Sequence, residues 1–429
     1  MIRFAYLRDG MVNKTPATIE LARRLNMAGH SVTFVGPLSL AEHYEETPFE
    51  FRSLFSPTSE TGGYKSHSKS RFSSADALIS AVKHENPDMI LADSECHVGI
   101  ISALSMAKPL TIVSCWFNLF YAPGTPPLNS TTHPSKAPET GVMIERAWRA
   151  LRRSARVAQI KSYVGRSAWR SRFRAIPYTS KSRADLRALA KNLGVDLRAL
   201  ANDGHWLQPF VYPSTPYILL NAEELDFGAP AHIPVHYVGP MVGAPDPVHT
   251  SKSEISPLIY CTFGSFWRAN GDVIRRVISA FRKRPDWRLI VGLGGDGQPE
   301  DFPDTPQNVK IQSWAPQREV LQEASVTICH GGVSTINESI ATQTPIIVCS
   351  TGAVDQPGNG ARVAFHGVGR TADAATMSED HLIEMIDDCL SNDIYTENLA
   401  HFRSVFQEYA HSNRAVHVFE TIFSNAHSQ

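Results

Sequence analysis

The sequence lacks the features that mark several classes of protein. No Cys-x-x-Cys pair occurs that could serve a zinc or redox site, and no apolar run approaches membrane-spanning length. A formal net charge of −1 gives no global field that would recruit nucleic acid. The cysteines fall mostly within apolar, strand-like runs and are typical of small buried side chains in a reducing compartment. They are Cys96, Cys115, Cys261, Cys329, Cys349 and Cys389.

The first residues do not resemble a targeting segment. The chain starts with the strand-like run Ile2–Leu7, whose internal Arg3 is unlike the apolar centre of a secretory signal. We therefore expect a cytoplasmic protein. A chain of 429 residues is too long for one compact core, which predicts two domains of about two hundred residues each.

Strand-like and helix-like segments alternate along the chain and predict an α/β fold with parallel, doubly wound sheets. In the first half the predicted elements are Ile2–Leu7, Thr18–Ala28, Ser31–Val35, Met89–Ala92, His97–Met106 and Leu110–Ser114. The pattern restarts at Leu258–Phe263, after the segment Pro240–Ser256, which is rich in Pro, Gly and Ser and is interpreted as a linker. This predicts domains at residues 1–240 and 241–410, with a terminal helix within 411–429.

The stretch Arg146–Arg183 carries about a dozen Arg and Lys and no acidic residue, with apolar and aromatic residues between them. One interpretation is a pair of cationic helices that rest on an anionic membrane surface. The other is a solvated helical flap over a pocket, which the i, i+3 and i, i+4 spacing of the arginines favours. The aromatic segment Trp116–Tyr121 precedes this insertion and is interpreted as a pocket wall.

The most informative pattern lies between Trp314 and Gln356. Val326–Cys329 predicts a buried strand, and Ser334–Ala341 predicts a helix that follows Gly331-Gly332. Glycines let a phosphate approach the backbone, and a helix start offers unpaired N–H groups and the positive end of its dipole.

Side chains around this turn suit the rest of a nucleotide sugar. Glu338 lies one helical turn beyond Ser334, so it can reach past a phosphate toward a ribose diol. Trp314 offers a flat ring to a base. Asp355 and Gln356 are placed to hold sugar hydroxyls.

From Trp314 to Gln356 the chain closely resembles the signature of the UDP-dependent glycosyltransferases, the family-1 group of the GT-B fold, in which two Rossmann-like domains face a cleft. The resemblance implies uracil stacking on Trp314, a nucleoside contact from Gln317, and diphosphate contacts from His330 and the first turn. A second loop, Thr262–Ser265, resembles the family's loop that faces the diphosphate. The N-terminal half is faintly similar to zeaxanthin glucosyltransferases. The donor-site residues implied are Gly264, Ser265, Trp314, Ala315, Gln317, His330, Gly332, Val333, Ser334, Thr335, Glu338, Asp355 and Gln356.

The resemblance implies inverting transfer of a hexose, with glucose as first choice, from a UDP-sugar to a hydroxyl of a hydrophobic or aromatic small molecule. The UDP-sugar is then a substrate, and no cofactor is expected. No metal is expected either, because the chain has no Asp-x-Asp pair and the helix start with His330 would replace the cation. The cleft is expected to close on the donor about a hinge near Pro240. Two alternatives are a non-catalytic UDP-sugar-binding partner subunit and a nucleotide-sugar epimerase of the same fold.

The N-terminal half departs from the family pattern at the catalytic base. Relatives usually carry Gly-His-x-x-Pro after the first strand, whereas the loop Asp9–Pro16 has no histidine, and that position falls near Asn13 or Lys14. Neither asparagine nor an ordinary lysine takes a proton at neutral pH.

Asp93, at the end of a predicted strand, is the candidate base, because such strand ends gather functional groups and because it matches the carboxylate that partners the missing histidine. Asp9, Lys14 and His97 are further candidates. The alternative is that Asp93 is a helix N-cap and His97 a surface histidine.

Overall fold

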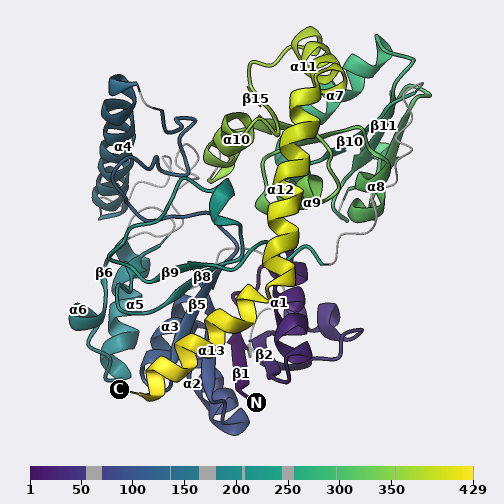
Figure 1. Cartoon of the computed structure of the whole chain (residues 1–429). Helices are drawn as coiled ribbons and strands as arrows, with labels where there is room; N and C mark the ends of the chain where they lie inside the picture. The colour runs from purple at the N-terminus through teal and green to yellow at the C-terminus, as the bar shows by residue number, and fades with distance from the viewer. Residues whose placement is uncertain are drawn as a thin grey trace.

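The computed structural model describes residues 1–54, 70–135, 137–163, 180–204, 208–243, 256–295, 297–352 and 354–428. Part of the basic stretch, residues 164–179, and most of the expected linker, residues 244–255, lie outside the described residues. Two parallel sheets with flanking helices form the two halves of the molecule (Figure 1). The predicted α/β class with two doubly wound parallel sheets is confirmed.

The N-terminal sheet has the strand order β3-β2-β1-β4-β5-β8-β9, and neighbouring strands pair in parallel. Apolar strands such as β4 are buried along their whole length, as expected where helices cover both faces of a sheet. The strands are β1 (Arg3–Leu7), β2 (Ser31–Pro37), β3 (Glu50–Leu54), β4 (Met89–Asp93), β5 (Leu110–Ser114), β8 (Tyr217–Leu219) and β9 (Val235–Tyr237). A short antiparallel pair joins β6 (Asn202–Asp203) to β7 (Phe210–Val211).

The C-terminal sheet has the order β12-β11-β10-β13-β14-β15 and is also parallel. Its strands are β10 (Leu258–Thr262), β11 (Arg288–Gly292), β12 (Val309–Gln312), β13 (Val326–Cys329), β14 (Ile346–Ser350) and β15 (Gly369–Asp373). In each sheet the order reverses beside the first strand, between β1 and β4 and between β10 and β13. Ligands of open α/β sheets bind outside the carboxyl ends of strands at such points.

Helices flank both sheets (Figure 1). Those of the N-terminal half are α1 (Thr15–Met27), α2 (Ser70–Glu85), α3 (His97–Leu104), α4 (Pro138–Tyr163), α5 (Ser180–Asn192) and α6 (Leu197–Leu200). Those that follow are α7 (Gly271–Arg282), α8 (Gln317–Glu323), α9 (Val333–Ala341), α10 (Gln356–Phe365), α11 (Glu379–Ser391), α12 (Asp393–His411) and α13 (Arg414–His427). None of the helices in the described part of the chain is long and apolar enough to cross a membrane.

The last helix returns to the first domain. In Figure 1 the long helix α12 runs down from the C-terminal half, and α13 crosses the N-terminal half. Val416 and Phe419 are buried in one core with Phe4 and Leu21, and the His30 ring lies 3.2 Å from a Glu420 oxygen. The N-terminal core is therefore completed by the end of the chain.

A buried ion pair joins the two halves. The Asp226 carboxylate, in the loop between β8 and β9, accepts from Nε and Nη2 of Arg362 on α10 at 3.0 and 2.5 Å. Their side chains are 0% and 1% exposed. The Arg362 guanidinium also lies 4.8 and 4.3 Å from the ring centres of Phe117 and Phe227. Asp226 has further donors in the backbone N–H of Asn118 and the Tyr237 hydroxyl, so its charge is well compensated.

Apolar and backbone contacts extend this junction. Leu128 and Trp148 of the N-terminal half share a core cluster with Val348 of the C-terminal half. The backbone N–H of Gly358 donates to the Leu128 carbonyl at 2.7 Å. A Cβ at position 358 would lie 2.3 Å from that oxygen, so only glycine allows this approach.

The helix α4 carries the first part of the basic stretch, and one of its faces is packed against the protein. The Trp148 indole is buried and donates to the Thr125 carbonyl at 2.6 Å, and Ile144 and Leu151 lie in the same shared core. Val142 and Met143 are about half exposed (49% and 51%). This half of the stretch is thus an amphipathic helix seated on the domain junction.

We predict that Asp226→Asn destabilises the protein by about 3–5 kcal/mol, because it leaves the Arg362 charge buried without its anionic partner. Urea unfolding with linear extrapolation measures the change. The matched control is Arg187→Gln, which removes an exposed pair with Asp203 and is expected to cost less than about 1 kcal/mol. Equal effects of the two substitutions would contradict the prediction.

Candidate functional site

The glycine turn after β13 has a geometry that other residues do not allow. Gly331 has φ +96°, and a Cβ there would lie 2.9 Å from Cγ1 of Val348 and 3.3 Å from the Gln356 carbonyl oxygen. Gly332 is the N-cap of α9. The first N–H groups of α9 have no acceptors within the helix, so they are available to an anion at this turn.

Asn359 connects this turn to the loop that precedes α10. Its buried amide donates to the Gly331 carbonyl at 2.7 Å and to Oδ2 of Asp355 at 2.5 Å. No sequence motif singled out Asn359, which lies one turn after Asp355, the N-cap of α10. Gln356 is held as well, since its Oε1 accepts from the backbone and the hydroxyl of Thr351. The expected phosphate and sugar positions therefore form one rigid unit.

The Asp355 carboxyl group has an unusual proton affinity. Burial, with the negative charge of Glu95 in addition, raises its pKa to about 7 despite the hydrogen bond from Asn359. Glu95 belongs to the N-terminal domain, so this coupling acts between the two domains. A carboxyl that titrates near neutrality is suited to exchange hydrogen bonds with sugar hydroxyls.

The residues that are expected to bind the nucleoside are in contact with one another. Nε2 of Gln317 donates to Glu338 at 2.6 Å, and Oε1 of Gln317 accepts from the Tyr260 hydroxyl at 3.5 Å. Burial raises the pKa of Glu338. The Trp314 ring is 72% exposed, whereas Ala315 beside it is buried. An exposed ring next to two polar groups is suited to stack a base while those groups bind a ribose.

His330 is neutral at physiological pH, because burial lowers its pKa to about 4. Its ring stacks on that of Phe263 with centres 6.3 Å apart. A Cβ on Gly264 would lie 4.0 Å from Cε1 of His330, so the loop after β10 faces the turn after β13, as the resemblance implied. The side chain of Ser265 lies outside the described residues. A neutral His330 can donate a hydrogen bond to a phosphate but contributes no charge.

A small pocket lies between the two domains at this point. It is lined by Pro16, Ala17, Cys115, Leu220, Met241, Val242, Val333, Ser334, Asn337 and Glu338. The starts of α1 and of α9 therefore face each other across it. Thr335 is buried at 8% exposure and lies 3.5 Å from the Gln317 amide.

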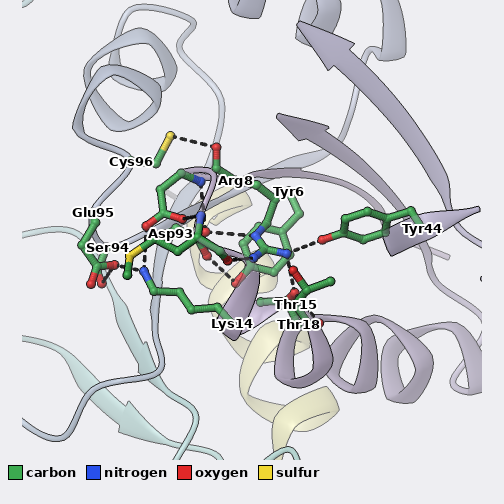
Figure 2. Close-up of polar contacts among 12 residues, drawn as sticks. Tyr6, Arg8, Lys14, Thr15, Thr18, Tyr44, Asp93, Ser94, Glu95 and Cys96 are labelled. Carbon is green, nitrogen blue, oxygen red and sulfur yellow. Dashed lines mark hydrogen bonds and ion pairs between the residues drawn. The ribbon is translucent and has the colours of Figure 1, made fainter. Parts of the chain in front are cut away.

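Charged residues gather on the N-terminal side, after β1 and β4 (Figure 2). Lys14 stands near the position of the missing histidine and binds two carboxylates, Asp9 at 2.7 Å and Glu95. Although burial opposes it, these carboxylates raise the pKa of Lys14 well above its usual value. Lys14 is thus a fixed cation and cannot serve as a base.

Asp93 is buried more deeply than these three residues. Its Oδ1 accepts from the Tyr6 hydroxyl at 3.0 Å, and its Oδ2 accepts from Nε of Arg8 at 3.0 Å (Figure 2). Burial raises the pKa of Asp93 against the effect of Arg8. With 1% of its surface exposed, Asp93 is better suited to be the charge partner of Arg8 than to meet an acceptor. Its role as base stays a prediction that this geometry does not favour.

The alternatives considered for Asp93 and His97 are wrong. The helix α3 begins at His97 with Cys96 as N-cap, so Asp93 does not cap it. His97 is 5% exposed and belongs to the interior. No sequence pattern singled out Arg8 and Glu95, because their ion-pair partners Asp93 and Lys14 lie more than eighty residues away along the chain.

We predict that Asp355→Asn stabilises the protein increasingly as the pH rises from about 4 to 7. A carboxyl group whose pKa is raised by folding stabilises the protein at a pH below its pKa in the unfolded state. This stabilisation is lost as the pH rises through its pKa in the folded state. Asparagine has no such titration. Because one pKa unit corresponds to about 1.4 kcal/mol, we expect a gain of at least that size at pH 8 relative to pH 4.

Thermal unfolding of both proteins across this pH range measures the effect. Asp272→Asn, at an exposed position, controls for the loss of one carboxylate. A stability difference between wild type and Asp355→Asn that is the same at pH 4 and pH 8 would refute the prediction.

Comparison with known proteins agrees with this site. Residues 226–423 match the model of the family UDPGT, described as UDP-glucoronosyl and UDP-glucosyl transferase. The oleandomycin glycosyltransferase of Streptomyces antibioticus is 30% identical over 135 residues, which are 30% of this chain and 31% of the relative. The zeaxanthin glucosyltransferase of Pantoea ananas is 25% identical over 207 residues, or 46% and 47% of the two chains. The alignments thus span less than half of each curated relative.

Solved structures match over almost the whole chain. The glycotransferase of kitacinnamycin superposes with a TM-score of 0.70 at 19% identity and covers 98% of both chains. The calicheamicin glycosyltransferase CalG4 gives 0.65 at 16% identity over 99% of both. At such identities the likeness shows the fold. The segment that carries the glycine turn therefore matches the UDPGT family, and the two domains together have the GT-B fold.

Proposed function

We propose that the protein transfers a hexose, with glucose as first choice, from a UDP-sugar to a hydroxyl of a hydrophobic or aromatic small molecule, with inversion at the anomeric carbon. One observation carries the proposal. The turn Gly331-Gly332, the start of α9 and the Asp355–Asn359 pair form one rigid unit at the carboxyl ends of β13 and β14, opposite the charged cluster of the N-terminal domain.

The donor fits this unit group by group. The diphosphate takes the N–H groups at the start of α9, where the helix dipole favours negative charge, together with the hydroxyls of Ser334 and Thr335. His330 donates a neutral hydrogen bond. Glu338 accepts from the ribose hydroxyls, Trp314 stacks on the base, and the sugar lies beside Asp355 and Gln356.

The chemical step places growing negative charge on the departing diphosphate. Donors that are held in place before the reaction stabilise such charge without having to reorganise. The fixed turn at Gly331 and the buried position of His330 provide this preorganisation. On the acceptor side, Trp116 and Tyr121 are partly exposed aromatic side chains, which supports a hydrophobic or aromatic acceptor.

A non-catalytic UDP-sugar-binding subunit is the second candidate. It is favoured by the absence of the loop histidine and by the ion pairs that occupy Lys14. Incubation with UDP-glucose and a panel of phenolic and aliphatic acceptors separates the two, because a transferase releases UDP and forms an adduct with the mass of one added hexose. A binding subunit does neither.

We expect His330→Ala and Glu338→Ala to weaken UDP-sugar use by roughly 10- to 150-fold in kcat/KM, since loss of a hydrogen bond to a charged partner costs about 1.5–3 kcal/mol. Glu319→Ala, at an exposed position on the neighbouring helix α8, is the matched control. Normal donor kinetics in both site variants, with all three proteins folded, would refute the placement of the donor.

We also expect transfer to persist in excess EDTA, because the phosphate site is built from N–H and hydroxyl donors. UDP should raise the unfolding temperature. At a UDP concentration of one hundred times its Kd, the free energy of unfolding should increase by about 2.7 kcal/mol. Turnover that disappears with EDTA and returns with magnesium or manganese would refute the metal-independent mechanism.

A further inference from the structure

We propose that Glu95 is the general base of the acceptor side and takes the place of the missing histidine. This assignment rests on the proposed transfer function. His97 is buried in the interior, and four other ionisable side chains compete for the role: Asp9, Lys14, Asp93 and Glu95. Their contacts separate them.

The contacts of the other three make each of them a weaker candidate. Lys14 is a permanent cation between two carboxylates. Asp9 accepts from Lys14 and from the Met11 amide, and although burial opposes it, the Lys14 charge lowers the pKa of Asp9, which weakens it as a base. Asp93 is enclosed by Tyr6 and Arg8 beneath the others.

Glu95 is the most accessible carboxylate of the cluster. Its side chain is 13% exposed, compared with 6% for Asp9 and 2% for Asp93. It follows β4 in the loop before α3, at the carboxyl edge where the pocket lies. Its charge also acts on Asp355, the residue expected to hold the transferred sugar. Of the three carboxylates, Glu95 is therefore the one that an acceptor at this edge of the sheet can reach most easily.

The remaining contacts orient Glu95 and leave room for one more donor. Oε2 accepts from Lys14 and from the Ser94 hydroxyl, and Oε1 accepts from the Trp116 indole. A carboxylate has about four lone-pair positions, and these three donors are the side-chain partners of Glu95 within the described part of the chain. An acceptor hydroxyl can supply the fourth bond, at Oε1 beside the aromatic wall.

The proposed step transfers the sugar and the acceptor proton together and needs no further reactant. The acceptor oxygen forms a bond to the anomeric carbon while the bond from that carbon to the phosphate oxygen breaks, and its electron pair leaves with UDP. The acceptor proton moves to Glu95, which becomes a neutral carboxylic acid and later releases the proton to water. Lys14 then remains paired with Asp9, so no buried charge is left without a partner.

The test compares Glu95→Gln with wild type on phenol and on the more acidic 4-nitrophenol, with UDP-glucose as donor. We expect kcat on phenol to fall by about 10²-fold or more, and to fall much less on 4-nitrophenol, whose hydroxyl needs less help to ionise. The Kd of UDP should not change. In Glu95→Ala, added formate should restore part of the rate on phenol.

The control Glu42→Gln, an exposed carboxylate of the same domain, should keep wild-type rates. Turnover of Glu95→Gln within about threefold of wild type on phenol would overturn the assignment. So would an equal loss on both acceptors without rescue by formate, which indicates a structural role. If wild type binds UDP but glycosylates no acceptor, the transfer function itself fails, a result distinct from the other two.

Discussion

The buried pair between Arg362 and Asp226 determines how the two domains meet, and the position of the site depends on that junction. Arg362 lies on α10, the helix that follows Asp355, so the ion pair holds the loop proposed to bind the sugar against the N-terminal domain. The close approach of Gly358 to Leu128 fixes the same helix through the backbone. Removing one partner of a buried ion pair is strongly destabilising, because the other charge stays buried without a partner. The domain closure expected about a linker near Pro240 would therefore have to leave this junction intact.

The charges of the site are divided between the domains according to the chemistry proposed for each. The C-terminal side offers donors to an anion: the start of α9, hydroxyls and a neutral His330. The N-terminal side offers carboxylates, with Lys14 and Arg8 as fixed counter-charges. Leaving-group charge thus grows where donors are concentrated, and the acceptor proton is released where acceptors are concentrated. The coupling between Glu95 and Asp355 marks the boundary between the two environments.

The sequence predicted the fold well and indicated where the glycine turn lies, because both depend on local patterns. Strand, Gly-Gly turn and helix are consecutive in the chain, and β-branched runs alternate with helical segments in both halves. The acceptor side was harder to predict. The contacts of Arg8 with Asp93 and of Lys14 with Glu95 join segments that are distant in sequence. The period of the hydrophobic pattern does not indicate which side chain of such a cluster is the most exposed. Asn359 was missed for a different reason, since a buried amide inside a helix has no motif of its own.

The return of α13 to the first domain bears on how these proteins can be recombined. A chimera cut near residue 240 would take its N-terminal core from one parent and Val416 and Phe419, which fill that core, from the other. The mismatch would lie far from either substrate and would appear as poor folding rather than altered specificity. Exchange of the N-terminal domain of this chain with that of a relative therefore requires that residues 414–427 be transferred together with it.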